Sequence, residues 1–406
     1  MQVNEFSRAT SDDGELLRLL ARLEEELNVH WDFGRNLVLA WCLRGDAIDI
    51  IMFPHYDVGN VQRVRETKRS GAEGFFQNLV SGSKRLSVRS FENALKALEI
   101  SAVRVQLPGL KALRGRRHFA KIEVLIQRYG VTFYEARAVA LFDIVGFSKL
   151  TAFERLAQLN SLAYSCNAAQ SKFKQHSSRF DFANSTTGDG FYVWNRDDGV
   201  NANIDLYSYV HLILADNALA RQKAENRTAG APLLKTAFHI ASYYELFHAN
   251  QLRPSKFNYI VGDATIELAR IVEKAVPGQI LIGDFDSAGC ESVGSASMNA
   301  LSFIEKVQPR TSKLRGLKLS GQQVEQIRCY LTGPQRPGGG YSIRQFRITD
   351  KHGYQRTVYN AKLNIHRLQA PPIFLGLMDS SLSKFERQSN VEAVGIVDAG
   401  AASIGR

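Results

Sequence analysis

The sequence contains little cysteine, and this scarcity excludes several kinds of site. Only 4 of the 406 residues are cysteine, with no Cys-x-x-Cys pair and no histidine-rich run beside them. Such wide spacing argues against a zinc site and against a disulfide framework, and it indicates reduced core thiols in a cytoplasmic protein. The four residues are Cys42, Cys166, Cys290 and Cys329.

Long hydrophobic runs are also missing. Apolar segments such as NLVLAWCL and YEARAVALF fall well short of the roughly 20 residues that a membrane-spanning helix needs. The N-terminus, MQVNEFSRATSDDGELL, carries acidic residues and no apolar stretch, which is unlike a signal peptide. We therefore expect a cytoplasmic protein with no membrane partner.

The charge balance is basic but does not select a partner. The chain is 45% hydrophobic and 22% charged, as in ordinary soluble proteins, and its formal net charge is +11. Nucleotides, nucleic acids and acidic membranes would all satisfy that charge. The most basic run, LPGLKALRGRRHFAK at 107–121, is explained more simply by a solvated surface beside a linker than by a nucleic-acid site. Nucleic-acid binding therefore ranks last among the functions considered.

A chain of 406 residues predicts two or three domains. We expect an N-terminal regulatory or accessory region at 1–133, a catalytic region at 134–331 and a C-terminal accessory module at 341–395. Residues 332–341 are rich in proline and glycine and indicate a linker. Residues 11–28 predict a helix, because leucine recurs there at helical spacing. These leucines are Leu16, Leu17, Leu20, Leu23 and Leu27.

The pattern of the middle region predicts an α+β fold. A buried strand is expected at 136–147, a helix at 149–175, a hairpin at 180–194 and a second amphipathic helix at 204–226. Further strands and one helix follow, so helices should cover a mixed sheet, and the C-terminal module should be small and β-rich. The apolar face predicted for the first helix consists of Leu150, Phe153, Leu156, Ala157, Ala163 and Tyr164.

Two aspartates stand at turns that a cation or a phosphate can approach. Asp143 ends the strand in FDIVGFS, and Asp189 lies at the Gly-Asp-Gly corner of STTGDGFYVW. If the hairpin pairs with the strand, both carboxylates meet at one edge of the sheet, where a hard divalent cation relieves their repulsion. Mg²⁺ is typically held by one or two carboxylates plus substrate phosphates, and the amides beside Gly146 and Gly190 suit a triphosphate. The alternative is two capping or turn aspartates in an unrelated domain.

Four segments in order, FDIVGFS, TTGDGF, KTAFHIA and YIVGDATIELAR, resemble the catalytic domain of the class III nucleotidyl cyclases over residues 137–331. The resemblance implies the cyclase fold, a nucleoside triphosphate substrate and two divalent cations per site, either Mg²⁺ or Mn²⁺. In the family, one metal activates the ribose 3′-hydroxyl for attack on the α-phosphorus and the other holds the β- and γ-phosphates.

The resemblance assigns roles to individual residues. It makes Asp143 and Asp189 catalytic and metal-binding, and it adds Ile144 to the metal-binding residues. It places Ile144, Gly146 and Phe147 in contact with the substrate.

The resemblance also assigns two cationic residues. Lys235 stands where the family has a phosphate-binding arginine, so the charge is kept but the bidentate fork is lost. Arg270, in the helix after Gly262, matches the family's transition-state arginine. The family's site forms between two protomers, one supplying the aspartates and the other the base-reading residues and the arginine, so a homodimer is implied. The alternative for Arg270 is a surface ion pair on a helix.

Three departures from the family bear on substrate and rate. Ser185 replaces the Lys of adenylate-forming and the Glu of guanylate-forming members, and Tyr259 replaces the Asp or Thr of adenylate-forming members. A large phenol leaves less room in the base pocket, which suits a pyrimidine better than a purine. Ile266 replaces a helper asparagine and cannot hydrogen-bond the substrate. Thr265 and Asn258 are near enough in sequence to be considered as substitutes.

These altered positions, together with the C-terminal SIRQFRI…PPIFLGLMDS segment, resemble the bacterial pyrimidine cyclases of Pycsar anti-phage defence. That resemblance implies cyclic UMP, or else cyclic CMP, as a signal to a separate effector protein, with UTP favoured over CTP. Two alternatives remain open: an adenylate or guanylate cyclase with an unorthodox base pocket, and a catalytically silent nucleotide-binding homologue. For Tyr259 the alternative is packing at a dimer interface, and His239 is expected in the core.

Overall fold

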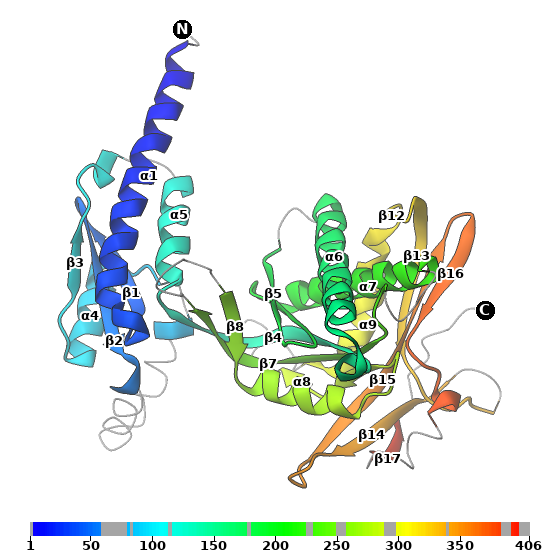
Figure 1. Cartoon of the computed structure of the whole chain (residues 1–406). Coiled ribbons are helices and arrows are strands. Elements are labelled where there is room, and N and C mark those ends of the chain that lie inside the picture. Colours follow the sequence, from blue (N-terminus) through cyan, green and yellow to red (C-terminus); the bar gives the residue numbers. More distant parts are fainter. Residues whose placement is uncertain are drawn as a thin grey trace. The chain divides into compact units, whose positions relative to one another are not determined.

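The computed structural model divides the chain into two compact units (Figure 1). The first comprises Met1–Tyr134 and Tyr244–Val261, and the second comprises Glu135–Tyr243 and Gly262–Arg406. The residues that the structure describes are 3–57, 79–81, 84–112, 116–176, 180–224, 230–248, 257–287, 298–337, 341–382 and 391–397.

The first unit contains a three-stranded antiparallel sheet in the order β1-β2-β3. The strands are β1 (Asn36–Arg44), β2 (Ala47–Pro54) and β3 (Val103–Gln106). In addition, β8 (Phe257–Val261) pairs with the end of β7 (Leu234–His248). The helices are α1 (Val3–Trp31), α4 (Val88–Leu98) and α5 (Arg116–Gln127).

Helices cover both faces of this sheet because successive side chains of a strand point to opposite sides. Trp41 and Ile48 pack with leucines of α1 and with apolar residues of α5, whereas Cys42 and Ile51 pack with Phe91 of α4. The helix expected at 11–28 is thus confirmed as part of α1. Leu19 enters the core of this unit, whereas Leu17 is 64% exposed.

A lysine lies inside the first unit. Lys84 is 2% exposed, and its ammonium donates to the carbonyl oxygens of Val80 and Val131. Burial lowers the pKa of Lys84 to about 7, because the charged form loses its hydration. Between that value and its ordinary pKa of 10.5, the unfolded chain holds a proton that the folded chain has released.

We therefore expect the unfolding free energy of this unit to rise by about 2 kcal/mol from pH 7 to pH 9, since the unfolded state binds more protons over this range. Lys84→Met should remove this rise. Urea unfolding at both pH values, followed by the fluorescence of the buried Trp41, measures it. The exposed Lys96→Met is the matched control, and an equal rise in Lys84→Met and in the original chain would contradict the prediction.

The second unit is built on a large mixed sheet in the order β12-β13-β15-β9-β7-β4-β6-β5. The β7–β9 pair is parallel, and the pairs β4–β6 and β9–β15 are antiparallel. The α+β expectation, with helices over a mixed sheet, is therefore confirmed. The strands of this sheet are β4 (Val131–Ile144), β5 (Phe182–Thr186), β6 (Gly190–Asn195), β7 (Leu234–His248), β9 (Ile280–Gly283), β12 (Lys318–Leu319), β13 (Gln322–Leu331), β14 (Ile343–Thr349), β15 (Gln355–Arg367), β16 (Ala370–Leu375) and β17 (Val391–Val397).

Helices lie on both sides of β4 and β7, with α6 and α7 on one side and α8 on the other (Figure 1). Phe142 and Phe238 join the core under α6, α7 and α9. Side chains alternate along each strand, so Asp143 and Lys235 belong to the opposite face. The helices are α6 (Ala152–His176), α7 (Val200–Lys223), α8 (Asp263–Lys274) and α9 (Ala300–Thr311), and a small separate pair is formed by β10 (Asp286–Ser287) and β11 (Met298–Asn299).

The predicted buried face of α6 was wrong. Phe153, Leu156 and Tyr164 are 79%, 60% and 69% exposed. Apolar residues occur on two sides of this helix, so spacing alone did not select the packed side. The side that enters the core carries Leu162, Cys166, Ala169 and Phe173.

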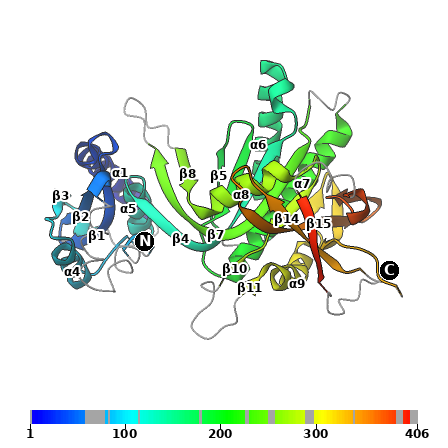
Figure 2. The same ribbon diagram turned by 90° about the horizontal axis from the view of Figure 1, so that it is seen from below.

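The C-terminal strands do not stand apart from the central sheet. β15 pairs with β9, β13 and β16, and it also pairs with β14, beside which it lies in Figure 2. The segment expected as a separate module at 341–395 therefore contributes strands to the same sheet and belongs to the same compact unit. In the expected linker, the Thr332 amide donates to the Asn360 carbonyl of β15.

Three cysteines are buried free thiols, as expected: Cys42, Cys166 and Cys329. Burial raises the pKa of Cys166 to about 12, so it stays protonated. Cys290 lies outside the described residues. Within the described ranges, no helix has the length and apolar character needed to cross a bilayer. The end of the basic run at 107–121 belongs to α5.

Candidate active site

The strand β4 and the hairpin β5–β6 bring two carboxylates to one place. Asp143 lies opposite Gly190 in the antiparallel register of β4 and β6. Beyond this pair, the Ile144 amide donates to the Asp189 carbonyl oxygen at 3.0 Å. The hairpin therefore pairs with the strand, which is the condition under which the two carboxylates were expected to meet. Asp189 lies next to Asp143 at the end of the β4–β6 ladder.

Gly190 makes this approach possible. A Cβ atom at this position would lie 1.8 Å from the carbonyl oxygen of Phe142, a separation that no side chain tolerates. The corner before it is closed by the Thr187 amide, which donates to the Gly190 carbonyl at 3.0 Å. The Thr187 hydroxyl also donates to Oδ1 of Asp189 at 3.2 Å, so the turn orients the carboxylate.

A lysine from the next strand faces the same carboxylate. Nζ of Lys235, on β7, lies 3.8 Å from Oδ2 of Asp143, and both side chains are about one-quarter exposed, at 23% and 27%. Burial raises the pKa of Asp143, the Lys235 ammonium opposes that rise, and the Asp189 carboxylate adds to it. Lys235 therefore outweighs the effect of Asp189 on Asp143, but it does not offset burial and Asp189 together.

This geometry fits a divalent cation that is shared with a substrate. In the described part of the chain, no three residues among His, Cys, Asp and Glu cluster to form a complete metal cage. The repelling pair of Asp143 and Asp189 is nevertheless the kind of donor set that Mg²⁺ uses when phosphates and water supply the remaining oxygens. Asp143 and Asp189 are the residues that would hold such an ion.

The loop after β4 turns sharply beside the pair. Gly146 takes a positive φ of 70°, which favours glycine, and the Lys149 amide donates to its carbonyl. Ile144 is 2% exposed as a whole residue, and its amide already donates to the Asp189 carbonyl. The Phe147 ring packs against the core, and Nε of Arg155 donates to its carbonyl at 3.2 Å.

Ser185 lies one strand farther out, on β5, and is partly buried. It pairs across the hairpin with Tyr192, a residue that sequence reasoning missed. The Tyr192 hydroxyl donates to the Thr265 carbonyl of α8 at 3.2 Å, and burial raises its pKa. The sequence did contain a signal for Tyr192. This residue comes two positions after Gly190, which places it on the same face of the sheet as Asp143.

Arg270 lies in an ion pair within the chain. Its Nε is 3.6 Å from Oδ2 of Asp350, whose side chain is 4% exposed and which also accepts from Arg356 at 3.0 Å. Arg270 thus has an ion-pair partner within its own chain, and that partner is a buried aspartate rather than a residue on the helix surface. The residues that the structure brings together are instead Asp143, Asp189 and Lys235.

Tyr259 lies on β8 opposite Leu246, in the first unit, and is 39% exposed. The neighbouring Asn258 donates to Oε1 of Glu245 at 3.0 Å.

The substitutes considered for the helper asparagine already have partners. The amide of Asn258 is bonded as described, and the hydroxyl of Thr265 donates to the Gly262 carbonyl at 2.8 Å. Ile266 itself is 53% exposed at the start of α8. His239, as expected, is buried, and burial lowers its pKa to about 4, which keeps the ring neutral.

No protein-family model matches the sequence, and no curated protein is significantly similar to it. Several solved structures of nucleotidyl cyclases are similar in shape. The adenylyl cyclase CyaB from P. aeruginosa is 14% identical, with 59% of this chain and 97% of that chain covered and a TM-score of 0.34. The guanylate cyclase domain of RhGC from Catenaria anguillulae, in complex with GTP, is 11% identical, with 59% and 100% covered and a TM-score of 0.33.

The guanylyl cyclase domain of the RhoGC fusion protein from the aquatic fungus Blastocladiella emersonii is 17% identical, with 38% of this chain and 81% of that chain covered and a TM-score of 0.30. At these identities and TM-scores, the similarity does not by itself assign a function to this chain.

Proposed function

We propose that the chain is a nucleotidyl cyclase that converts a nucleoside triphosphate into the 3′,5′-cyclic nucleotide and pyrophosphate. One observation carries this proposal: Asp143 and Asp189 are held side by side at the end of the β4–β6 ladder, with Lys235 facing Asp143. The ordered motifs described above support the same conclusion.

Each of these residues has a task in that reaction. Asp143 and Asp189 would hold the divalent cations, which when bound polarise the 3′-hydroxyl and the phosphate oxygens. Lys235 would attract a phosphate oxygen, because its ammonium is only partly offset by Asp143. The turn at Gly146 leaves room for the triphosphate beside the strand end, and a Cβ there would meet no atom within 4 Å.

We further propose that the base is a pyrimidine, with UTP favoured over CTP. Ser185 is too short to read a purine edge as a lysine or glutamate would, and Tyr259 offers a bulky phenol where purine cyclases keep a small polar residue. The site would be completed in a homodimer, in which Arg270 leaves Asp350 to approach the partner's nucleotide. The cyclic product would act as a signal to a separate effector protein, as in anti-phage defence.

A second candidate is a silent domain that binds a nucleotide without turnover. The ion pair between Arg270 and Asp350, together with the isoleucine at 266, favours it, because both reduce the groups available to the transition state. It predicts nucleotide-dependent thermal stabilisation without any product.

The test is to incubate the purified full chain with each of the four nucleoside triphosphates and Mn²⁺ or Mg²⁺, and to identify products by mass spectrometry. We expect cyclic UMP, or else cyclic CMP, to exceed cyclic AMP and cyclic GMP by at least about tenfold, the discrimination typical of a pocket that lacks specific purine contacts. Mainly cyclic AMP or cyclic GMP would overturn the pyrimidine proposal. Stabilisation by nucleotide with no cyclic product would favour the silent domain.

A further inference from the structure

Three C-terminal strands carry aromatic and cationic side chains on one face of the sheet. Arg328 of β13, Asn364 of β15 and Phe374 of β16 lie opposite one another in the strand register. Tyr330 of β13 likewise lies opposite Lys362 of β15. Directly paired residues point to the same side of a sheet, so these five residues form one surface, which we call the outer face. Their neighbours along the strands pack on the other side, in the core with α7 and α9.

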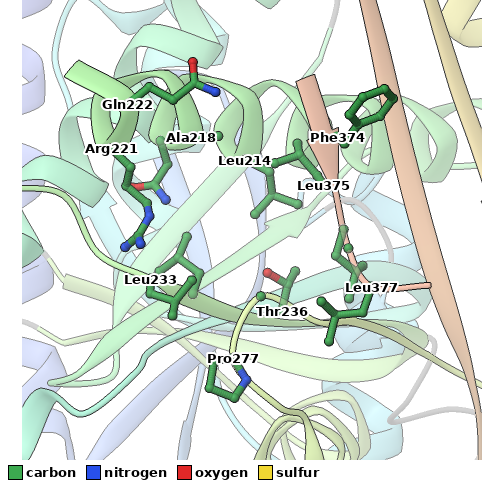
Figure 3. A pocket seen from close by; sticks show the side chains of 15 residues that line it. Leu214, Ala218, Arg221, Gln222, Leu233, Thr236, Pro277, Phe374, Leu375 and Leu377 are labelled. Atoms are coloured by element: carbon green, nitrogen blue, oxygen red, sulfur yellow. The ribbon is translucent and has the colours of Figure 1, made fainter. Parts of the chain in front are cut away.

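Phe374 gives the outer face an open aromatic ring. The residue is 59% exposed, and Figure 3 shows its ring turned away from Leu214 of α7. The next residue, Leu375, turns towards Leu214 and borders a cavity that Thr236 of β7 also lines (Figure 3). An exposed ring on a sheet can stack with a planar group of a ligand.

A second aromatic position lies across the strands. Nδ2 of Asn364 donates to the Tyr330 hydroxyl at 3.3 Å. Burial raises the pKa of Tyr330, that bond lowers it, and the phenol of Tyr341 raises it further, so the two phenols are close enough to interact. Tyr341 is 40% exposed. Only β15 separates Tyr330 from the strand of Phe374, a distance of about 10 Å at the usual strand spacing, so the two positions can hold two separate bases.

A lysine lies between these aromatic positions. Nζ of Lys362 is 5.8 Å from the centre of the Phe374 ring and 3.5 Å from the carbonyl oxygen of Gly376. Burial lowers the pKa of Lys362, and no carboxylate among the described residues pairs with it. An ammonium has three N–H donors, so the bond to Gly376 leaves donors for a phosphate oxygen. A phosphate beside Lys362 would favour its charged form and offset the effect of burial.

Acidic residues are scarce on these strands. β15 and β16 contain none, and the one in β13, Glu325, occupies the bulge after Val324. The outer face therefore favours anions, in a chain whose net charge is +11. Aromatic rings combined with cations on a sheet are typical of proteins that bind single-stranded nucleic acid, because the rings stack with bases and the cations contact the backbone.

We infer that the outer face binds single-stranded DNA or RNA, with one base stacked on Phe374 and a phosphate at Lys362. The bases of a duplex are stacked on each other, so a duplex cannot offer them to these rings. This surface is separate from the basic run at 107–121, and its binding does not depend on the proposed cyclase reaction.

The probe is a fluorescein-labelled oligo-dT strand of about 20 nucleotides, longer than the usual single-strand footprint, titrated with the full chain and followed by fluorescence anisotropy. Phe374→Ala should weaken binding by about five- to 100-fold, the usual effect of removing one stacking partner. Lys362→Gln should lower the slope of log affinity against log salt by about 0.7, measured between about 50 and 200 mM salt. Phe153→Ala, at a ring that is 79% exposed on α6, and Lys96→Gln, at an exposed lysine of α4, are the matched controls and should behave as the original chain.

Three results would overturn the inference: no saturable binding by the original chain, equal affinities for Phe374→Ala and Phe153→Ala, or tighter binding of the same strand after it is annealed to oligo-dA. If circular dichroism shows that Phe374→Ala does not fold, the salt slopes of Lys362→Gln and Lys96→Gln decide, and equal slopes overturn the inference. Oligo-rU in place of oligo-dT shows which of the two nucleic acids binds more tightly. Failure to form a cyclic nucleotide would instead mark failure of the proposed function and leave these affinities unchanged.

Discussion

Asp143→Asn is expected to reduce cyclic nucleotide formation by about 10²- to 10³-fold, the usual effect of removing one group that stabilises developing charge. The amide keeps the shape of the side chain but cannot hold a cation or face Lys235 as an anion. The measurement is the initial rate of pyrophosphate release with saturating nucleotide and Mn²⁺.

The same substitution should leave the melting temperature unchanged or raise it. Burial raises the pKa of Asp143, Lys235 lowers it and Asp189 raises it, and the net rise shows that the setting disfavours the charge of this carboxylate. An amide is free of that cost. This outcome separates a site residue from a structural one, since a structural aspartate would lose stability together with activity.

Asp286→Asn is the matched control, because this exposed aspartate lies on β10, outside the site. It should retain full activity. Equal rates for Asp143→Asn and Asp286→Asn would contradict the assignment of the aspartate pair.

Gly190→Ala is expected to destabilise the second unit by about 3 kcal/mol and to abolish activity, because overpacking at a rigid contact carries a cost of this order. The new methyl group would lie 1.8 Å from the Phe142 carbonyl oxygen. β4 pairs with strands on both sides and cannot yield, so the hairpin must move away and take Asp189 with it. Chemical unfolding and the rate assay measure the two effects.

Gly395→Ala is the control for the loss of a glycine in a strand. A Cβ there would meet only the end of the flexible Gln345 side chain, at 3.4 Å. Its stability should change by less than about 0.5 kcal/mol, as at ordinary surface sites. A Gly190→Ala chain as stable as Gly395→Ala would show that the hairpin does not depend on the close approach.

The aspartate pair could be predicted from sequence because its geometry is local. A strand end, a glycine corner and a hairpin fix the register of Asp143 against Gly190 once the two strands pair, and the alternation of side chains then sets the face. The order of strands and helices in the middle region could also be predicted, because each element follows from a local sequence pattern.

Features that depend on distant segments could not be predicted. The ion pair of Arg270 needs Asp350, and the cavity beside Thr236 needs β16, and both lie in the segment expected to form the C-terminal module. The prediction of which side of α6 is buried was wrong for another reason. Both sides of that helix carry apolar residues, and tertiary packing buries Leu162 while it leaves Leu156 exposed.

The most direct test of the central claim is the mass of the product that the full chain makes from UTP in the presence of Mn²⁺, compared with the product of Asp189→Asn. The aspartate pair, together with Ser185 and Tyr259, predicts 3′,5′-cyclic UMP and pyrophosphate in equal amounts from the original chain, and at least about 10²-fold less of both from the variant. Cyclic UMP at equal rates from both chains, or only UDP or linear UMP from the original chain, would contradict it.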